Sequence, residues 1–98
     1  MPFKLQMTLE AKTQLASIMN DSSKTGLQKQ IKKCFKLLSE NPRHPGLNSH
    51  PLIGSVESTG LKIWTSYVQN KTPSAHRILW SYSKTNKEII ILQIIPHY

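Results

Sequence analysis

The sequence predicts an α+β domain in the element order β-α-α-β-β-β, with two N-terminal helices packed on an antiparallel sheet. Three strand-like runs fill the last third of the chain, at residues 61–68, 75–82 and 88–95. Two stretches in the first half repeat apolar residues at helical spacing, and residues 3–7 alternate as a short strand does. A chain of 98 residues has the length of one domain, so we expect residues 1–98 to fold as a single unit.

The N-terminal elements follow from alternation, periodicity and capping residues. Thr8 ends the first strand and can cap a helix over about residues 9–19. A second helix is predicted over about residues 24–39, where one face is apolar. That apolar face consists of Leu27, Ile31, Cys34, Phe35 and Leu38. Residues 41–60 contain Pro, Gly and Ser and predict an irregular connection, a kind of segment that often carries function.

The three strands of the last third differ in character. Short turn-forming segments separate them, so neighbouring runs should pair antiparallel. In the middle run, Ile78, Trp80 and Tyr82 share one face by the period of two, and Arg77 lies on the other face. The final run, residues 88–95, is apolar on both faces, which predicts a central and covered strand.

The charge predicts an anionic partner. The formal net charge is +8, from 13 Lys and Arg residues against 5 Asp and Glu residues. Such a chain is attracted to nucleic acid or to an acidic protein, although a basic protein without either partner has the same composition. Four lysines line the second helix opposite its apolar face: Lys29, Lys32, Lys33 and Lys36. Their spacing fits a solvated surface and a phosphate-binding ridge equally well.

Several classes of protein are disfavoured. The single cysteine, Cys34, excludes an internal disulfide and fits the reducing cytoplasm, and its place on the apolar face predicts a buried thiol. We expect no membrane association, because there is no signal-peptide core and no apolar run long enough to span a bilayer. His44 and His50 have no metal-ligand spacing with the distant cysteine, and no cofactor motif occurs, so neither a metal nor a cofactor is expected.

The ordered set of these features resembles the RelE/ParE superfamily of bacterial toxins from type II toxin–antitoxin pairs. The resemblance rests on the element order, the Lys-rich second helix, and the segments 41–47, 63–64, 76–82 and 95–98, and it covers nearly the whole chain. YoeB-like members also end on His-Tyr. The resemblance implies a ribosome-dependent endonuclease that cleaves mRNA in the A site, with a cognate antitoxin, the ribosome and mRNA as partners.

The same resemblance implies an active site. Arg77 takes the place of the strand arginine that binds the scissile phosphate, and His97 and Tyr98 take the place of the terminal acid group. RNA cleavage needs a base for the 2′-hydroxyl, a cation for the developing phosphorane charge and an acid for the leaving 5′-oxygen. The forked guanidinium of Arg suits the phosphate, His exchanges a proton near neutral pH, and Tyr donates or stacks on a base.

Departures from the family leave the general base open. Active relatives carry basic side chains where this chain has Thr65 and Tyr67, and YoeB-like members carry a carboxylate near the position of His44. The candidates for the base are His44, His50, Glu57, Lys62 or a group of the ribosome. RNA-binding candidates are Lys29, Lys32, Lys33, Lys36, Lys62 and Tyr67. Two other functions stay open: a ParE-like toxin that poisons DNA gyrase without cleaving RNA, and an inactive regulator that binds the antitoxin.

Overall fold

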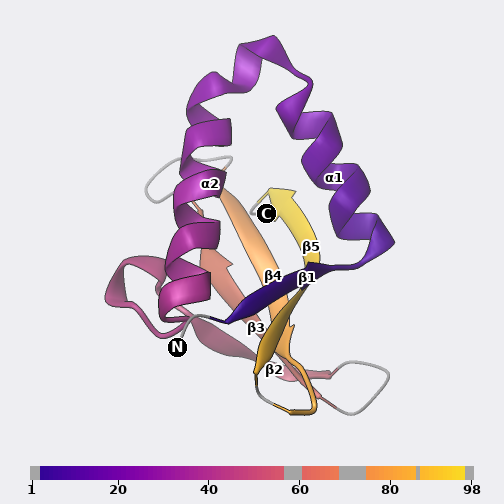
Figure 1. Ribbon diagram of the computed structural model, residues 1–98, viewed down its shortest axis with the longest axis vertical. Coiled ribbons are helices and arrows are strands. Elements are labelled where there is room, and N and C mark those ends of the chain that lie inside the picture. Colours follow the sequence, from indigo (N-terminus) through magenta and orange to yellow (C-terminus); the bar gives the residue numbers. More distant parts are fainter. Residues whose placement is uncertain (1–2, 57–60, 69–74, 86, 97–98) are drawn as a thin grey trace.

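Two helices pack on one face of a five-stranded sheet in the computed structural model (Figure 1). The structure describes residues 3–56, 61–68, 75–85 and 87–96. Along the chain the elements are β1 (Lys4–Met7), α1 (Leu9–Met19), the 3-10 turn η1 (Ser22–Lys24), α2 (Thr25–Glu40), the 3-10 turn η2 (Pro45–Leu47), β2 (His50–Val56), β3 (Lys62–Tyr67), β4 (His76–Tyr82) and β5 (Glu88–Pro96). The predicted α+β class is confirmed.

The sheet is mixed, with the strand order β1-β5-β4-β3-β2. The pairs β5–β4 and β4–β3 are antiparallel, as predicted from their short connections, and the pair β3–β2 is antiparallel as well. β1 pairs with β5 in parallel, with Lys4 opposite Glu88 and Met7 opposite Ile91. The prediction of a wholly antiparallel sheet is therefore wrong at β1, because a long crossover, here everything from α1 to β4, lets two strands run in the same direction. The interior position predicted for β5 is confirmed.

The prediction of an irregular connection over residues 41–60 is wrong in part. This segment contains η2 and the edge strand β2, which pairs with β3 through His50–Thr65 and Pro51–Trp64 before its register shifts. Pro51 lacks a donor for the sheet and disfavours a strand in the sequence, but an edge strand tolerates it because one side needs no partner. The element order is therefore β-α-α-β-β-β-β.

Both helices present their apolar faces to the sheet. The bounds of α1 agree with the prediction, and the Thr8 hydroxyl accepts from the Ala11 backbone N–H at 3.1 Å, as expected of a cap. α2 begins one residue later than predicted, after η1. Its buried residues are Leu27, Ile31, Cys34 and Leu38, and they pack with Ile78, Trp80, Ile89, Ile91 and Ile94 of the sheet. The predicted apolar face of α2 is confirmed.

A chain of polar side chains ties the segment before β2 to the middle of the sheet. The fully buried Trp80 donates from Nε1 to the Ser66 hydroxyl at 2.7 Å. Ser66 shares a hydrogen bond of 2.6 Å with Ser49, which donates to the Pro42 carbonyl at 2.8 Å. The Arg43 guanidinium adds a contact over the Trp64 ring, 5.5 Å from its centroid. These contacts fix the path of the chain as it enters β2.

Replacing Ser66 by Ala should destabilise the protein by about 1–3 kcal/mol, because the buried Trp80 N–H would lose its acceptor. Urea unfolding followed by tryptophan fluorescence measures this loss as a lower midpoint. Ser17→Ala, on the exposed side of α1, is the matched control and should leave the midpoint nearly unchanged. Equal midpoints for the wild type and Ser66→Ala would contradict the role given to this network.

Candidate functional site

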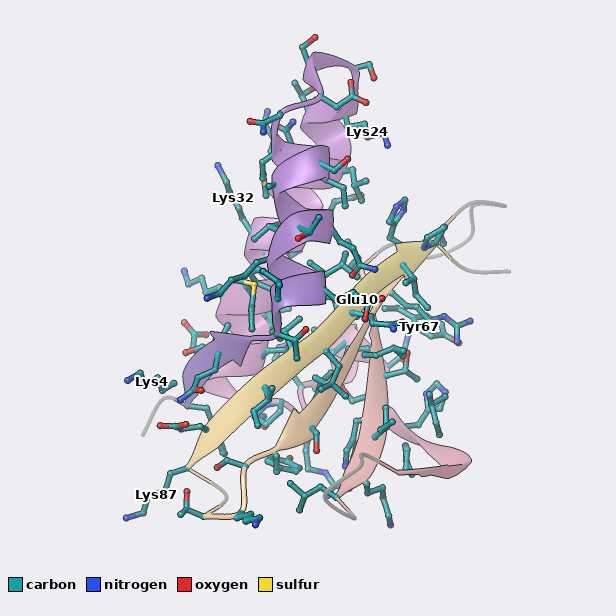
Figure 2. All side chains as sticks on the ribbon, turned by 90° about the vertical axis from the view of Figure 1, so that its right-hand side faces the viewer. Lys4, Glu10, Lys24, Lys32, Tyr67 and Lys87 are labelled. Carbon is teal, nitrogen blue, oxygen red and sulfur yellow. The ribbon has the colours of Figure 1, made fainter. Side chains whose placement is uncertain are left out.

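One face of the sheet carries no helix among the described residues. Side chains alternate along each strand, and Trp64, Ile78 and Trp80 point to the helices and join the core. The opposite face therefore receives the other set, which includes Ile63, Thr65, Tyr67, Arg77, Leu79 and Ser81. Figure 2 shows the helices on one side of the sheet and Tyr67 extending on the other. We call this second side the open face.

Arg77, Tyr67 and His50 lie together on the open face, and we call them the Arg77 cluster. Arg77 of β4 pairs directly with Tyr67 of β3, and its guanidinium carbon lies 5.6 Å from the Tyr67 ring centroid, a cation–π distance. The His50 ring of β2 meets the same Tyr67 ring edge-on, with centroids 5.9 Å apart and planes at 76°. A guanidinium, a phenol and an imidazole from three adjacent strands thus share one surface.

The His50 ring is held in one orientation by the backbone. Its Nδ1 lies 3.0 Å from the Asn48 carbonyl oxygen. A carbonyl only accepts, so Nδ1 carries the proton and the neutral ring keeps its lone pair on Nε2. Asn48 adopts a left-handed conformation with φ 48°, which Asn tolerates better than most residues. Nε2 of His50 is therefore suited to accept a proton next to Tyr67, whose ring Arg77 also contacts.

The other candidate bases are not part of the Arg77 cluster. His44 caps η2, and its Nδ1 accepts from the Gly46 backbone N–H at 2.9 Å. Lys62 is exposed at the far end of β3 and, by alternation, shares the helix side with Trp64. Glu57 lies outside the described residues. His97 and Tyr98 also lie outside them, so their predicted role as the terminal acid group stays a prediction; the strand before them ends with Pro96 opposite His76.

The four lysines of α2 lie on the other side of the molecule from the Arg77 cluster. Lys29, Lys32, Lys33 and Lys36 are all exposed, while the opposite face of α2 is buried against the sheet. In Figure 2, Lys32 points away from the sheet and Tyr67 lies on its far side. The structure does not bring the lysine ridge and Arg77 onto one surface, so a single short RNA segment cannot contact both.

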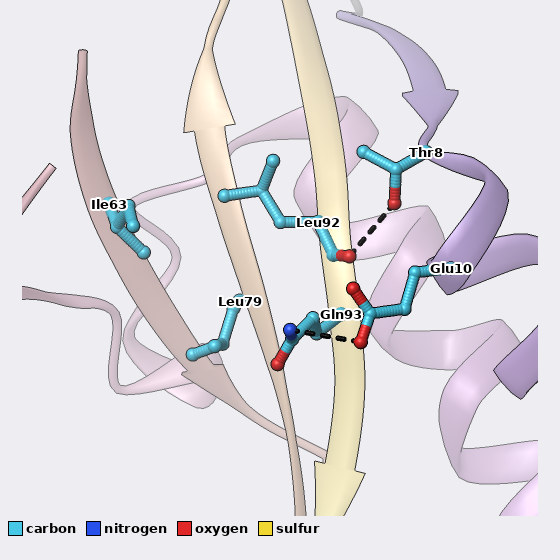
Figure 3. A pocket seen from close by; sticks show the side chains of 6 residues that line it. All are labelled: Thr8, Glu10, Ile63, Leu79, Leu92 and Gln93. Atoms are coloured by element: carbon cyan, nitrogen blue, oxygen red, sulfur yellow. Dashed lines mark hydrogen bonds between the residues drawn. The ribbon is translucent and has the colours of Figure 1, made fainter. Parts of the chain in front are cut away.

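An apolar groove continues along the open face from the Arg77 cluster. One cavity, of about 180 Å³, is lined by Thr8, Glu10, Ile63, Leu79, Leu92 and Gln93 (Figure 3). A second, of about 210 Å³, shares Thr8 and Leu92 with the first and reaches Lys84. Leu79 lies two positions beyond Arg77 on β4, so this apolar groove is the neighbour of the cluster. Nothing in the sequence pattern pointed to it, because its lining comes from distant segments.

Side chains of α1 close the outer edge of β5 where β1 ends. Thr8 donates from its backbone N–H to the Ile91 carbonyl at 3.0 Å and from its hydroxyl to the Leu92 carbonyl at 2.9 Å. The Gln14 side-chain oxygen accepts from the Ile94 N–H at 2.6 Å. These bonds replace the strand partner that β5 lacks beyond Ile91, and they hold one wall of the apolar groove in place.

Three further observations on the described residues concern metal binding, the Cys34 thiol and membrane-spanning helices. No group of His, Cys, Asp and Glu side chains among them is arranged to hold a metal ion. Burial raises the pKa of the Cys34 thiol to about 12, so this cysteine stays protonated and unreactive at neutral pH. Within the part of the chain that the structure describes, no helix is long and apolar enough to cross a membrane.

The fold matches solved structures along nearly its whole length. The YoeB dimer structure from Staphylococcus aureus gives a TM-score of 0.71 at 13% identity, covering 100% of both chains. The archaeal RelE–RelB complex from Pyrococcus horikoshii gives 0.69 at 15% identity, covering 98% of this chain and 96% of that one. The YoeB/ParE toxin from Agrobacterium tumefaciens gives 0.68 at 17% identity, covering 98% and 100%. This chain has the RelE/ParE fold.

The RelE/ParE fold was predicted from the ordered set of elements and motifs, and it is confirmed. No protein-family model matches the sequence, and no curated protein gives a significant sequence match. On its RelE/ParE scaffold this chain carries Arg77 near the start of β4, beside Tyr67 of β3 and within the open face. The arginine and tyrosine were predicted as site residues, whereas His50 was one of several candidate bases.

Proposed function

We propose that this protein is the toxin of a type II toxin–antitoxin pair and cleaves mRNA in the ribosomal A site. The observation that carries the proposal is the Arg77 cluster on the open face of a RelE/ParE fold. Arginine binds two phosphate oxygens at once, tyrosine stacks on a base, and a histidine with a free Nε2 accepts a proton. Arginine and histidine thus supply the cation and the base, two of the three groups that RNA cleavage by the 2′-hydroxyl requires.

In the proposed reaction, His50 Nε2 takes the proton of the 2′-hydroxyl, and the 2′-oxygen attacks the neighbouring phosphorus. Arg77 binds the non-bridging oxygens as the phosphorane gains charge. The bond from phosphorus to the 5′-oxygen then breaks, and that oxygen receives a proton from the acid, a role predicted for His97 or Tyr98. The products are a 2′,3′-cyclic phosphate and a free 5′-hydroxyl. Tyr67 holds a base next to the scissile phosphate by stacking.

The decisive experiment is induced expression in bacterial cells, followed by mapping of mRNA 5′ ends. In-frame cuts within codons, together with growth arrest, are the expected result. Purified protein should reproduce these cuts on mRNA bound to ribosomes and should leave free mRNA intact. DNA damage with intact mRNA would instead indicate a gyrase-directed toxin, and normal growth would indicate an inactive antitoxin-binding regulator.

The partner that we propose is an acidic antitoxin whose apolar side chains fill the apolar groove. The net charge of +8 favours an acidic chain. The groove includes the aliphatic side chains of Ile63, Leu79 and Leu92, and such an apolar patch suits a polypeptide better than RNA. Because the groove adjoins Arg77 on β4, a chain bound there would also block access of RNA to the cluster.

Replacing Ile63 by Glu should weaken antitoxin binding by about 100-fold or more, because a charge would be placed against apolar side chains. The measurement is rescue from growth arrest when the protein encoded next to this gene is co-expressed, with affinity measured on the purified pair. Gln30→Glu adds the same charge on the exposed side of α2 and should leave rescue intact. Undiminished rescue of the Ile63→Glu protein would place the antitoxin elsewhere.

A further inference from the structure

The Thr65 hydroxyl and Arg77 Nε are buried on the open face, and neither has a hydrogen-bond partner among the described residues. Thr65 is completely buried. It pairs with Leu79 on β4, whereas Arg77 pairs with Tyr67, so Thr65 and Arg77 occupy diagonal positions on neighbouring strands. Diagonal side chains of an antiparallel pair lie roughly 7–8 Å apart, near enough to hold one small anion between them.

The other two buried hydroxyls that the structure describes in the sheet contrast with Thr65. Ser66 accepts from Trp80 and bonds to Ser49, and Ser81 donates to the Lys62 carbonyl at 3.1 Å. An unpaired buried hydroxyl destabilises a fold, and Val has nearly the same shape without that defect. The hydroxyl of Thr65 therefore contributes nothing to the described packing. Unpaired polar groups of this kind mark places where a protein meets a ligand.

We propose that Thr65 is a second phosphate-binding residue, whose hydroxyl donates to a non-bridging oxygen of the phosphate held by Arg77. The inference rests on the proposed function. It adds a neutral hydrogen-bond donor, Thr65, to the cation Arg77 that binds the phosphate. In the free protein the Tyr67 ring reaches both His50, which pairs opposite Thr65, and Arg77. The proposed contact requires the hydroxyl and Nε to become accessible to the phosphate together, and stacking of the Tyr67 ring on a base would release Arg77 from that ring.

The test is Thr65→Val, which removes the hydroxyl and keeps the shape. Cleavage of ribosome-bound mRNA should fall on the order of tenfold to hundredfold, the usual worth of a hydrogen bond to a charged group. Its thermal midpoint should equal or exceed that of the wild type, because the hydroxyl has no partner to lose. Thr65→Ser keeps a hydroxyl and should keep most of the activity.

Ser81→Ala is the matched control, because Ser81 is a buried hydroxyl on the same face that already has a partner. It should lower stability and leave cleavage unchanged, the reverse of Thr65→Val. Full cleavage by Thr65→Val, or a clear loss of its stability, would overturn the proposal, since the hydroxyl would then be idle or purely structural.

A binding measurement separates this inference from the proposed function. Inorganic phosphate titrated into the full-length protein should shift the NMR signals of Thr65 and Arg77, and Thr65→Val should weaken this binding on the order of tenfold. If the wild type cleaves no mRNA, the proposed function fails, but a phosphate affinity that depends on Thr65 would still support the site. Equal phosphate affinity of the wild type and Thr65→Val would overturn it.

Discussion

Replacing Arg77 by Ala should reduce cleavage of ribosome-bound mRNA by a factor on the order of 10³ or more. An arginine that stabilises the charge of a phosphoryl transition state contributes about 10³–10⁵ in rate. Among the described residues, no other cation contacts the Tyr67 ring, so none there can replace Arg77. Growth arrest should disappear. An in vitro assay with purified ribosomes should show the corresponding loss of mRNA cleavage. Stability should fall little, because the cation–π contact with Tyr67 is worth only about 0.5–1 kcal/mol.

Two further variants make the Arg77 result specific. Arg77→Lys should recover only part of the activity, because a point charge cannot form paired hydrogen bonds to two phosphate oxygens. Lys32→Ala removes one charge from α2, on the other side of the molecule, and should cleave nearly as well as the wild type. Full toxicity of Arg77→Ala would refute the phosphate-binding role. If Lys32→Ala lost as much cleavage as Arg77→Ala, the effect would come from the net charge of the protein and not from a specific contact of Arg77.

Replacing His50 by Gln should lower cleavage by about 10²–10⁴, the usual worth of one general base. Gln keeps a donor for the Asn48 carbonyl but has no nitrogen lone pair to accept a proton. The loss should therefore appear in the rate of cleavage of bound mRNA and not in its binding.

His44→Gln is the matched control for His50, since both histidines lie in the same segment and only His50 meets Tyr67. This control should retain cleavage, with at most a small loss of stability at η2. If His44→Gln loses cleavage and His50→Gln retains it, the base is His44. If both keep full activity, the base comes from Glu57, Lys62 or the ribosome, the alternatives that the sequence leaves open.

Local signals in the sequence predicted the elements that local chemistry decides. The cap at Thr8, the two helical periodicities and the apolar run of β5 each appear with bounds within about a residue of those observed. β2 was missed because Pro51 disfavours a strand by itself, and only its edge position beside β3 permits one. The parallel pairing of β1 was missed because it depends on how the whole chain crosses over, which no short window of residues reports.

The site residues likewise divide into those that the sequence indicated and those that depend on how distant strands are placed. Arg77 was predicted because a single charge in the middle of an apolar strand is visible in the sequence, and its family resemblance gave it a role. The choice of His50 among the candidate bases depends on the register of β2 against β3, which the sequence does not specify. The family resemblance marked Thr65 only as a departure from a basic side chain, since an unpaired hydroxyl becomes visible only when its neighbours are placed.

The pairing of β1 with β5 also governs when a newly made chain can fold. Among the described residues, residues 4–7 pair in the sheet only with residues 88–91, and Thr8 bonds to Leu92, 84 positions later. A nascent chain therefore cannot complete its five-stranded sheet until β5 has left the exit tunnel, and contacts so distant in sequence form slowly. Arg77 gains its neighbour Ile95 at that same late moment. The five-stranded sheet that supports the Arg77 cluster is thus incomplete while residues before β5 are still being added.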